Sequence, residues 1–384
     1  MKKVIRANAR YWLQFLKEIS GRELLTESQL RGAGLALEAA LAIPELWTMT
    51  RDLALSLHPH MEQRGYWSDW DRCLQTLIAR ASQREDRRTA ADLLLRRGVI
   101  QRQRGEFRNA ARSCSQALAS YRRLEDPHGR ALVFHRLGDA CRLQGKFWRA
   151  EVFCCAALEI LGSQGEIDEL AQAENRLGLT YFDQRRFSDA LPHLLRAESL
   201  WRQAGDTHGL AKALHNLGEL HRRSGDPARA LTYLDQAVQS YLVVGDEIHA
   251  ARTRLDIGNV YLRQSDFARA ETVYLEAESV LRNAGDSLYL AGARLNLGIV
   301  YSRLGNWSEA EACFKRSLEQ WCSREDLWWQ ANTLGEMSAL YRARGDLAMA
   351  RLMIDEAWAL ISGKDSLRYE TLRRELLERR KELE

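Results

Sequence analysis

Small residues recur at a fixed interval of 40 positions along most of this 384-residue chain. One column of them is Gly98, Gly138, Gly178, Gly218, Gly258, Gly298 and Ser338. An alanine precedes each of these residues by seven positions, another follows each by twelve, and both alanine columns are filled in every unit. A glycine inside a helix costs about 0.5–1 kcal/mol relative to alanine, so its regular return predicts places where two helices come close. A fixed period of this length indicates a repeat array.

Each unit reads as a helix, a short turn and a second helix. Glycine stands in the turn at 105, 145, 225, 305 and 345, and it is favoured just past a helix end because it accepts the left-handed conformation. Two units have Arg185 and Ser265 at this place instead. Proline is scarce, with 5 in the whole chain, which permits long uninterrupted helices.

Further residues keep the same register. Tyrosine recurs at 181, 261, 301 and 341, and a third alanine column stands at 117, 157, 197, 237, 277 and 357. Together with Asn-Leu-Gly at 216–218 and 296–298, this pattern resembles the tetratricopeptide repeat. The period is similar to that of the long-helix subtype found in kinesin light chains, Pins-type adaptors and the sensor domains of bacterial STAND NTPases. The resemblance implies an all-α fold, a right-handed α-solenoid of helix-turn-helix repeats.

The repeats leave flanking regions at both ends. We expect a helical extension over 1–43, a degenerate first repeat over 44–84, seven repeats over 85–363 and a capping helix over 364–384. In the degenerate repeat Gly65 keeps the register, but His58 replaces the helix glycine and Trp70 replaces the alanine. Terminal repeats are expected to be atypical in this way. The last helix has a narrow stripe of leucines, at 367, 372, 376 and 383, that would cover the last repeat.

The bulk composition disfavours several classes of protein. A net charge of +4 is modest for a dedicated nucleic-acid binder. We find no apolar run that could span a membrane and no signal peptide, so a cytoplasmic location is expected. No phosphate-loop, HExxH or GxSxG motif is present, and the seven cysteines, which lack metal spacing, are interpreted as small buried hydrophobes. We therefore expect no enzymatic activity, no cofactor and no metal.

The resemblance also implies where a ligand would bind, because in this family the first helix of each pair lines a concave groove. Counted from the alanine that opens the helix, positions +1, +4, +5, +8, +11 and +12 share one face. The candidate peptide-binding residues at these positions are Arg96, Arg136, Arg176, Asn216, Asn296, Arg142, Arg222, Arg263, Arg303, His135, Asn175, His215 and Asn259. Arg102 shares position +11 with Arg142 and Arg222. In the long-helix relatives, asparagine at this place holds the backbone of an extended peptide, since an amide both donates and accepts.

We expect a scaffold or sensor module that binds a protein or peptide, with acidic side chains against Arg96, Arg136 and Arg176. An alternative is a regulator whose superhelix changes pitch when a peptide binds. A third is a nucleic-acid binder that uses the arginine columns, which the modest charge disfavours. Exposed helix faces are normally charged, so ion pairs with Asp139 or Glu219 could instead account for several of the arginines.

The tryptophans divide into two groups. Trp148, Trp201, Trp307, Trp321 and Trp358 fall on packing positions of second helices and are predicted to fill the core or the convex side. Trp328 and Trp329 stand at a helix start and are a candidate exposed contact patch.

Overall fold

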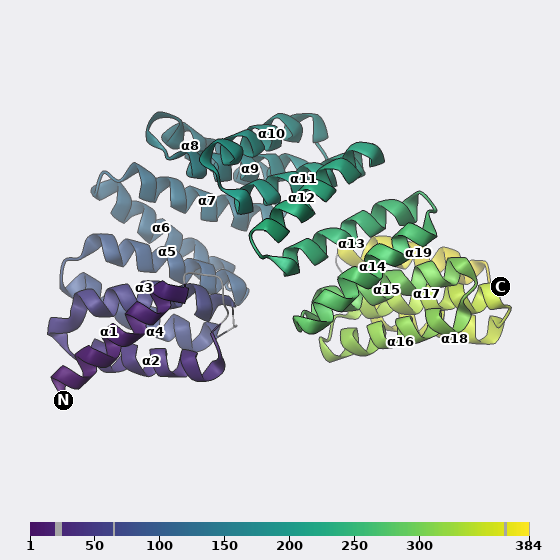
Figure 1. Ribbon diagram of the computed structural model, residues 1–384, viewed down its shortest axis with the longest axis horizontal. Coiled ribbons are helices and arrows are strands. Elements are labelled where there is room, and N and C mark those ends of the chain that lie inside the picture. Colours follow the sequence, from purple (N-terminus) through teal and green to yellow (C-terminus); the bar gives the residue numbers. More distant parts are fainter. Residues whose placement is uncertain (20–24, 64–65, 365–366, 384) are drawn as a thin grey trace. The chain divides into compact units, whose positions relative to one another are not determined.

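The computed structural model describes residues 1–19, 25–63, 66–364 and 367–383, and within these ranges the chain is helical throughout, without a strand (Figure 1). It divides into two compact units, residues 1–193 and 194–384. The first unit contains α1 (Lys2–Ile19), α2 (Glu27–Leu41), a 3-10 turn (Pro44–Leu46), α3 (Trp47–Gln63), α4 (Trp67–Gln83), α5 (Arg87–Gln103), α6 (Phe107–Arg123), α7 (Pro127–Leu143), α8 (Phe147–Gln164) and α9 (Ile167–Asp183). The boundary between the units falls within α10 (Phe187–Ala204).

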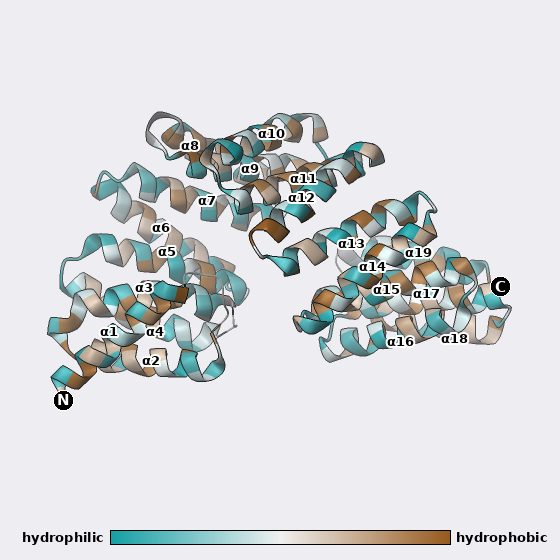
Figure 2. Cartoon of the chain, in the orientation of Figure 1, coloured by the Kyte–Doolittle hydropathy of each residue, from teal (hydrophilic) through white to brown (hydrophobic). Residues whose placement is uncertain are grey.

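The second unit continues with the same alternation of helices. It contains α11 (Thr207–Ser224), α12 (Pro227–Val243), α13 (Glu247–Arg263), α14 (Phe267–Asn283), α15 (Ser287–Leu304), α16 (Trp307–Ser323), α17 (Leu327–Arg344), α18 (Leu347–Ile361) and α19 (Leu367–Lys381). Hydrophobic and hydrophilic residues are mixed along the repeat helices (Figure 2), as expected for helices that each bury one face. In the described ranges, none of the helices combines the length and hydrophobicity needed to cross a bilayer.

Aspartate side chains start many of the repeat helices. Asp206, for example, accepts hydrogen bonds from the backbone N–H groups of His208 and Gly209, both at 3.0 Å. The aspartates that cap a helix in this way are Asp86, Asp126, Asp206, Asp226, Asp246, Asp266, Asp286, Asp326 and Asp346. Such a cap satisfies N–H groups that have no partner within the helix and stabilises the helix by about 1 kcal/mol.

The small-residue columns lie where helices meet. Within a repeat the first helix packs on the second, as α13 does on α14, and second helices such as α12, α14 and α16 also contact the first helix of the next repeat. A methyl group added at Gly258 would lie 2.4 Å from the ring of Tyr274, and one at Gly298 would lie 2.6 Å from the ring of Phe314. Ser338, which completes the glycine column, is buried and donates to the carbonyl oxygen of Ala350 at 2.7 Å. The predicted close approach of paired helices is therefore confirmed, as is the all-α repeat solenoid.

The two ends of the chain differ from the regular repeats. At the place of the missing glycine and alanine, the Trp70 indole N–H donates to Nδ1 of His58 at 2.8 Å, and both side chains are buried. At the other end, Leu372, Leu376 and Leu383 of the C-terminal segment are buried, and α19 packs on α17 and α18. Gly65 and the side chain of Leu367 lie outside the described residues.

The turn inside each repeat has the same left-handed conformation whether or not glycine occupies it. Gly225, Gly305 and Gly345 have φ angles of 89°, 80° and 87°. Arg185 and Ser265, which replace glycine in two repeats, have φ angles of 60° and 61°. A side chain costs about 1–2 kcal/mol in this conformation, so these two turns are strained relative to the others.

We therefore expect Ser265→Gly to stabilise the protein by about 0.5–1 kcal/mol, because the strain relieved exceeds the extra freedom that glycine gives the unfolded chain. The exposed Ser265 contributes its backbone N–H to the carbonyl oxygen of Leu262, a bond that glycine keeps. Thermal melting checks this, with Gly225→Ser as the reverse change that should lower the midpoint. A lower midpoint for Ser265→Gly would contradict the strain argument.

Candidate functional site

Five candidate arginines of the first unit lie on consecutive first helices. Arg96 and Arg102 are on α5, Arg136 and Arg142 on α7, and Arg176 on α9, and we call these five residues the arginine cluster. The helices are adjacent, since α5 contacts α7 and α7 contacts α9. Arg136 is exposed and the other four are half-buried.

Burial and mutual repulsion both act on the arginine cluster. Burial lowers the pKa of Arg96 and of Arg102, and the charge of Arg136 lowers both pKa values further, although the charges of Asp92 at Arg96 and of Glu62 at both residues oppose the shift. Burial lowers the pKa of Arg176 to about 10, with additional contributions from Arg136 and Arg102. The guanidinium groups thus disfavour one another's charge, which is the electrostatic condition that an anion would relieve.

Two members of the arginine cluster already have acidic partners. Arg176 forms an ion pair with Asp139, and Nη1 of Arg142 lies 2.5 Å from Oδ2 of Asp183, so both pairs connect α7 and α9. The alternative interpretation of the sequence, internal pairing with Asp139, therefore holds for Arg176. In contrast, Arg96, Arg102 and Arg136 have no carboxylate at ion-pair distance within the part of the chain that the structure describes.

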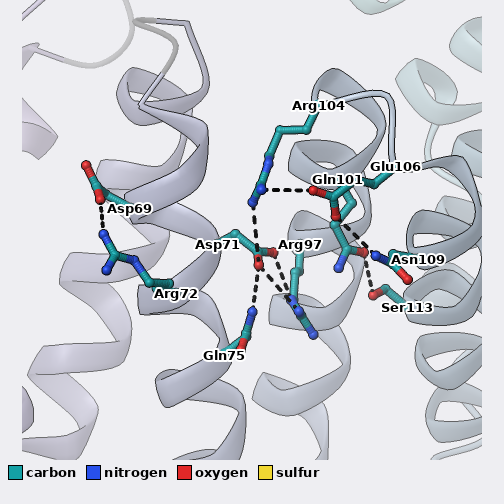
Figure 3. A network of polar contacts seen from close by, with 10 residues as sticks. All are labelled: Asp69, Asp71, Arg72, Gln75, Arg97, Gln101, Arg104, Glu106, Asn109 and Ser113. Atoms are coloured by element: carbon teal, nitrogen blue, oxygen red, sulfur yellow. Dashed lines mark hydrogen bonds and ion pairs between the residues drawn. The ribbon is translucent and has the colours of Figure 1, made fainter.

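Two arginines outside the cluster, Arg97 and Arg104, are neutralised by ion pairs within the protein. Arg97 and Arg104 converge on Asp71 of α4, with Nε of Arg97 at 2.9 Å from Oδ1 of the carboxylate (Figure 3). The amide of Gln75 donates to the same carboxylate at 2.6 Å. Arg104 also pairs with Glu106 at 2.9 Å, so two carboxylates balance the two guanidinium groups. The network ties α4 to α5, and these two arginines have a structural role.

The candidate residues of the second unit are mostly paired within the protein. Nε and Nη2 of Arg222 donate to both carboxylate oxygens of Glu219, at 2.6 and 2.8 Å. The His215 ring lies 3.0 Å from Asp256, and the amide of Asn296 donates to the Asn259 carbonyl at 3.0 Å.

The remaining candidates differ in their accessibility. Arg263 and Arg303 are exposed and have no ion pair among the described residues, whereas Asn175 and Asn216 are half-buried. His135 is only 3% exposed, and its Nε2 has no hydrogen-bond partner among the described residues. Its side chain does not reach the surface that a peptide would touch, so we leave it out of the proposed contacts.

Some expectations for tryptophan and cysteine are wrong. Trp201 and Trp321 are buried as predicted, but Trp148 is 74% exposed. Cys155 and Cys322 are exposed rather than buried. Trp329 stacks on Trp321 with ring centroids 5.2 Å apart and is half-buried, so it is not a freely exposed patch.

One group of side chains has the composition of a metal site. Ligand atoms of His208, Asp246 and His249 all lie within 4.8 Å of one another. The pKa of Asp246 falls to about 2, where burial opposes the shift and the hydrogen bonds from His249 outweigh it. Asp246 also caps α13, so a helix-capping role accounts for the carboxylate without a metal.

The paired helices, the buried small-residue columns and the row of first helices define a helical repeat protein. The tetratricopeptide repeat family model matches residues 169–242, 249–323 and 289–360, and the chain contains tetratricopeptide repeats over these residues. A search of curated protein sequences finds no significant match.

Solved structures share the fold at low sequence identity. A STAND signal transduction ATPase with a tetratricopeptide repeat sensor, from Pyrococcus horikoshii, has a TM-score of 0.66 and 15% identity over 94% of this chain and 56% of that one. The apo quorum sensor NprR from B. thuringiensis has a TM-score of 0.62 and 12% identity over 94% of this chain and 99% of that one. BtubC from P. vanneervenii has a TM-score of 0.51 and 23% identity over 56% of this chain and 90% of that one.

Proposed function

We propose that this chain is a recognition module that binds a protein or peptide across its first helices, with acidic side chains held by Arg96, Arg102 and Arg136. The observation that carries the proposal is the lack of a carboxylate partner for these three guanidinium groups among the described residues. The chain neutralises Arg97, Arg104, Arg142, Arg176 and Arg222 but not these three. Repeat solenoids bind partners on such extended surfaces.

The energetics favour recognition by several weak contacts. An exposed ion pair contributes about 0.2–1 kcal/mol, and pairs that include half-buried guanidinium groups fall at the upper end or above it. Three such contacts would add about 1–3 kcal/mol and would speed association with an acidic partner. In the second unit, taken by itself, the amides of Asn216 and Asn296 are candidates to bond a peptide backbone. Arg263 and Arg303 remain candidate contacts at the surface.

The test is selection of a phage-displayed library of random dodecapeptides on the full-length protein. We expect enrichment of Asp and Glu, and binding of the selected peptide that weakens about tenfold or more in the triple variant Arg96→Gln, Arg102→Gln, Arg136→Gln. The control is Arg122→Gln with Arg123→Gln, which removes two exposed cations from the second helix α6, away from the first helices. Circular dichroism checks that the helices remain.

Two results would overturn this proposal. One is enrichment of neutral or basic sequences by the wild-type protein. The other is tighter binding of a single-stranded oligonucleotide than of the selected peptide, with an affinity that falls steeply as salt is added.

A second candidate function is a regulator that changes shape when its ligand binds. The likeness in fold to the quorum sensor NprR, over nearly the whole of both chains, motivates this candidate. Small-angle scattering with and without the selected peptide separates the two functions. A smaller radius of gyration in the complex is expected of the regulator, whereas an unchanged radius is expected of a static scaffold.

A further inference from the structure

A cavity of about 500 Å³ lies in the first unit, between the repeat formed by α5 and α6 and the repeat formed by α7 and α8. Its lining includes Gly98, Ala111, Cys114, Ala140 and Cys141, which are all small. The volume lies in the range of ordinary ligand pockets, so the cavity can take one or two large side chains. Arg102 and Arg136 also line it, and the cavity is therefore continuous with the proposed arginine contacts.

The cavity exists because a pair of side chains present in other repeats is missing here. The Tyr181 hydroxyl donates to Oε1 of Glu151 at 3.0 Å, from a first helix to the second helix of the preceding repeat. Tyr301 with Glu271, and Tyr341 with Glu311, form the same hydrogen bond at the same spacing of 30 residues. At the cavity, Cys141 stands in place of the tyrosine and Ala111 in place of the glutamate.

Two further substitutions in the repeat pattern enlarge and line the cavity. Cys114 stands where later repeats have Leu234, Tyr274 or Phe314. Trp148 stands where five other repeats have a small residue, namely Ser188, Ala228, Ala268, Ser308 and Ala348. Trp148 lines the cavity together with Phe107 and Val152, which are 44% and 47% exposed. Helix packing in the other repeats requires no aromatic residue at this place, and exposed apolar side chains that gather at a cavity mark a binding site.

The charges around the cavity are almost all positive. Arg102, Arg108, Arg136, Lys146 and Arg149 line it. Asp139 is the one acidic residue among the lining side chains, and it forms an ion pair with Arg176. An occupant must therefore combine an apolar group with negative charge beside it.

We propose that this cavity binds a bulky apolar side chain of a peptide, and that acidic residues next to that side chain contact the surrounding arginines and lysine. The proposal rests on the proposed function and specifies how the peptide is anchored. A side chain that enters a pocket and is desolvated there contributes far more affinity than contacts at the rim. The apolar side chain would determine affinity and specificity, while the cations would steer the acidic segment to it.

The chain itself supplies the variant that closes the cavity. Cys141→Tyr with Ala111→Gln rebuilds the pair found in three other repeats, and glutamine keeps the carbonyl acceptor without adding a negative charge. We expect this variant to fold with an unchanged or higher melting temperature, because it copies an arrangement already present in the fold. Trp148→Ala is a second variant, which places at this position the residue found in other repeats and removes the aromatic wall.

The experiment uses the same dodecapeptide selection on the wild-type protein and on both variants. We expect the wild type to enrich peptides in which Phe, Trp, Leu or Met stands beside Asp or Glu. Replacement of that apolar residue by alanine should weaken binding to the wild type about tenfold, a ratio typical of a central anchor. Both variants should lose this difference while still preferring acidic peptides.

Each outcome separates this proposal from the proposed function. Acidic peptides without an apolar preference, or equal affinity after the cavity is closed, would overturn the anchor and leave the arginine contacts standing. An apolar preference without acidic residues would refute the acidic-peptide occupant. Wild-type selection with neither preference would overturn both proposals.

Discussion

Gly258→Ala should destabilise the protein by about 1–3 kcal/mol although it adds only one methyl group. The methyl carbon would lie 2.4 Å from Cε1 of Tyr274, far inside contact distance. The Tyr274 ring cannot move aside, because it is fully buried and its hydroxyl donates to Oδ1 of Asn259 at 2.8 Å. The higher helix propensity of alanine stabilises the folded state by about 1 kcal/mol at most. The steric overpacking is larger, so the net change in the free energy of unfolding is destabilising. Thermal and urea-induced unfolding measure the change.

Gly292→Ala is the matched control, since it makes the same change in the middle of another first helix. Apart from the backbone of its own helix and its chain neighbours, no atom lies within 4 Å of the position that its methyl carbon would take. We expect this variant to gain about 0.5–1 kcal/mol from helix propensity alone. Equal effects of the two substitutions would refute the idea that the glycine column is maintained by close helix contact.

The loss of stability on substituting a glycine of the column by alanine should depend on the size of the side chain that faces it on the second helix. A methyl group at Gly98 would lie 3.0 Å from the Cys114 sulfur, whereas one at Gly258 meets an aromatic ring at 2.4 Å. The sulfur stands at a cavity with space beside it. Gly98→Ala should therefore destabilise the protein less than Gly258→Ala does.

The helix pairs could be predicted from the sequence because small residues must meet at a fixed interval. Glycine and alanine columns identify which side of each helix is buried. In the structure, Ala131, Ala211 and Ala291 are at most 1% exposed. The turn is left-handed even at Arg185 and Ser265, where the sequence lacks the glycine that predicts it, because the position in the repeat constrains the backbone. Strong periodic constraints of this kind make the fold predictable from one sequence.

The site could be predicted only in part, because a helical face does not specify which charges meet. Arg176 and Asp139 are 37 residues apart, and their pairing depends on how two first helices lie side by side. Trp148 was predicted to fill the core or the convex side from its place on a second helix, but no neighbouring side chain covers it and it is 74% exposed. The sequence indicates the cavity only when the repeats are aligned. Cys141 and Ala111 then stand where other repeats have a tyrosine and a glutamate at the same spacing of 30 residues.

Two histidines at the same repeat position should respond to pH in opposite directions. Burial, together with the charges of Arg176 and Arg136, lowers the pKa of His135 from 6.5 to about 3. Burial also acts on His215, but the hydrogen bond and charge of Asp256, with the charge of Glu219, outweigh it and raise the pKa of His215. Other repeats have Leu95, Leu255 and Leu295 at this position, so leucine is a compatible replacement for both histidines.

For His135, the unfolded chain binds a proton that the folded chain does not bind between pH 6.5 and about 3. Stability therefore falls as the pH decreases through this range, and at pH 5 the cost is about 2 kcal/mol. His135→Leu removes the cost, so its melting temperature should rise relative to the wild type on going from pH 7.5 to pH 5. Because the side chain is 3% exposed, solvent does little to screen this effect.

For His215 the sign is reversed, because its folded pKa is raised. The stabilising contact with Asp256 is complete below the pKa of the unfolded histidine and is lost as the pH rises through the folded pKa. His215→Leu should therefore lose more stability at pH 5 than at pH 8, the opposite trend to His135→Leu. Parallel trends in the two variants would mean that the pKa at this position is set by burial alone. Opposite trends would show that the first helices are cationic around His135 and acidic around His215, and the cationic surroundings of His135 are what the proposed acidic peptide would meet in the first unit.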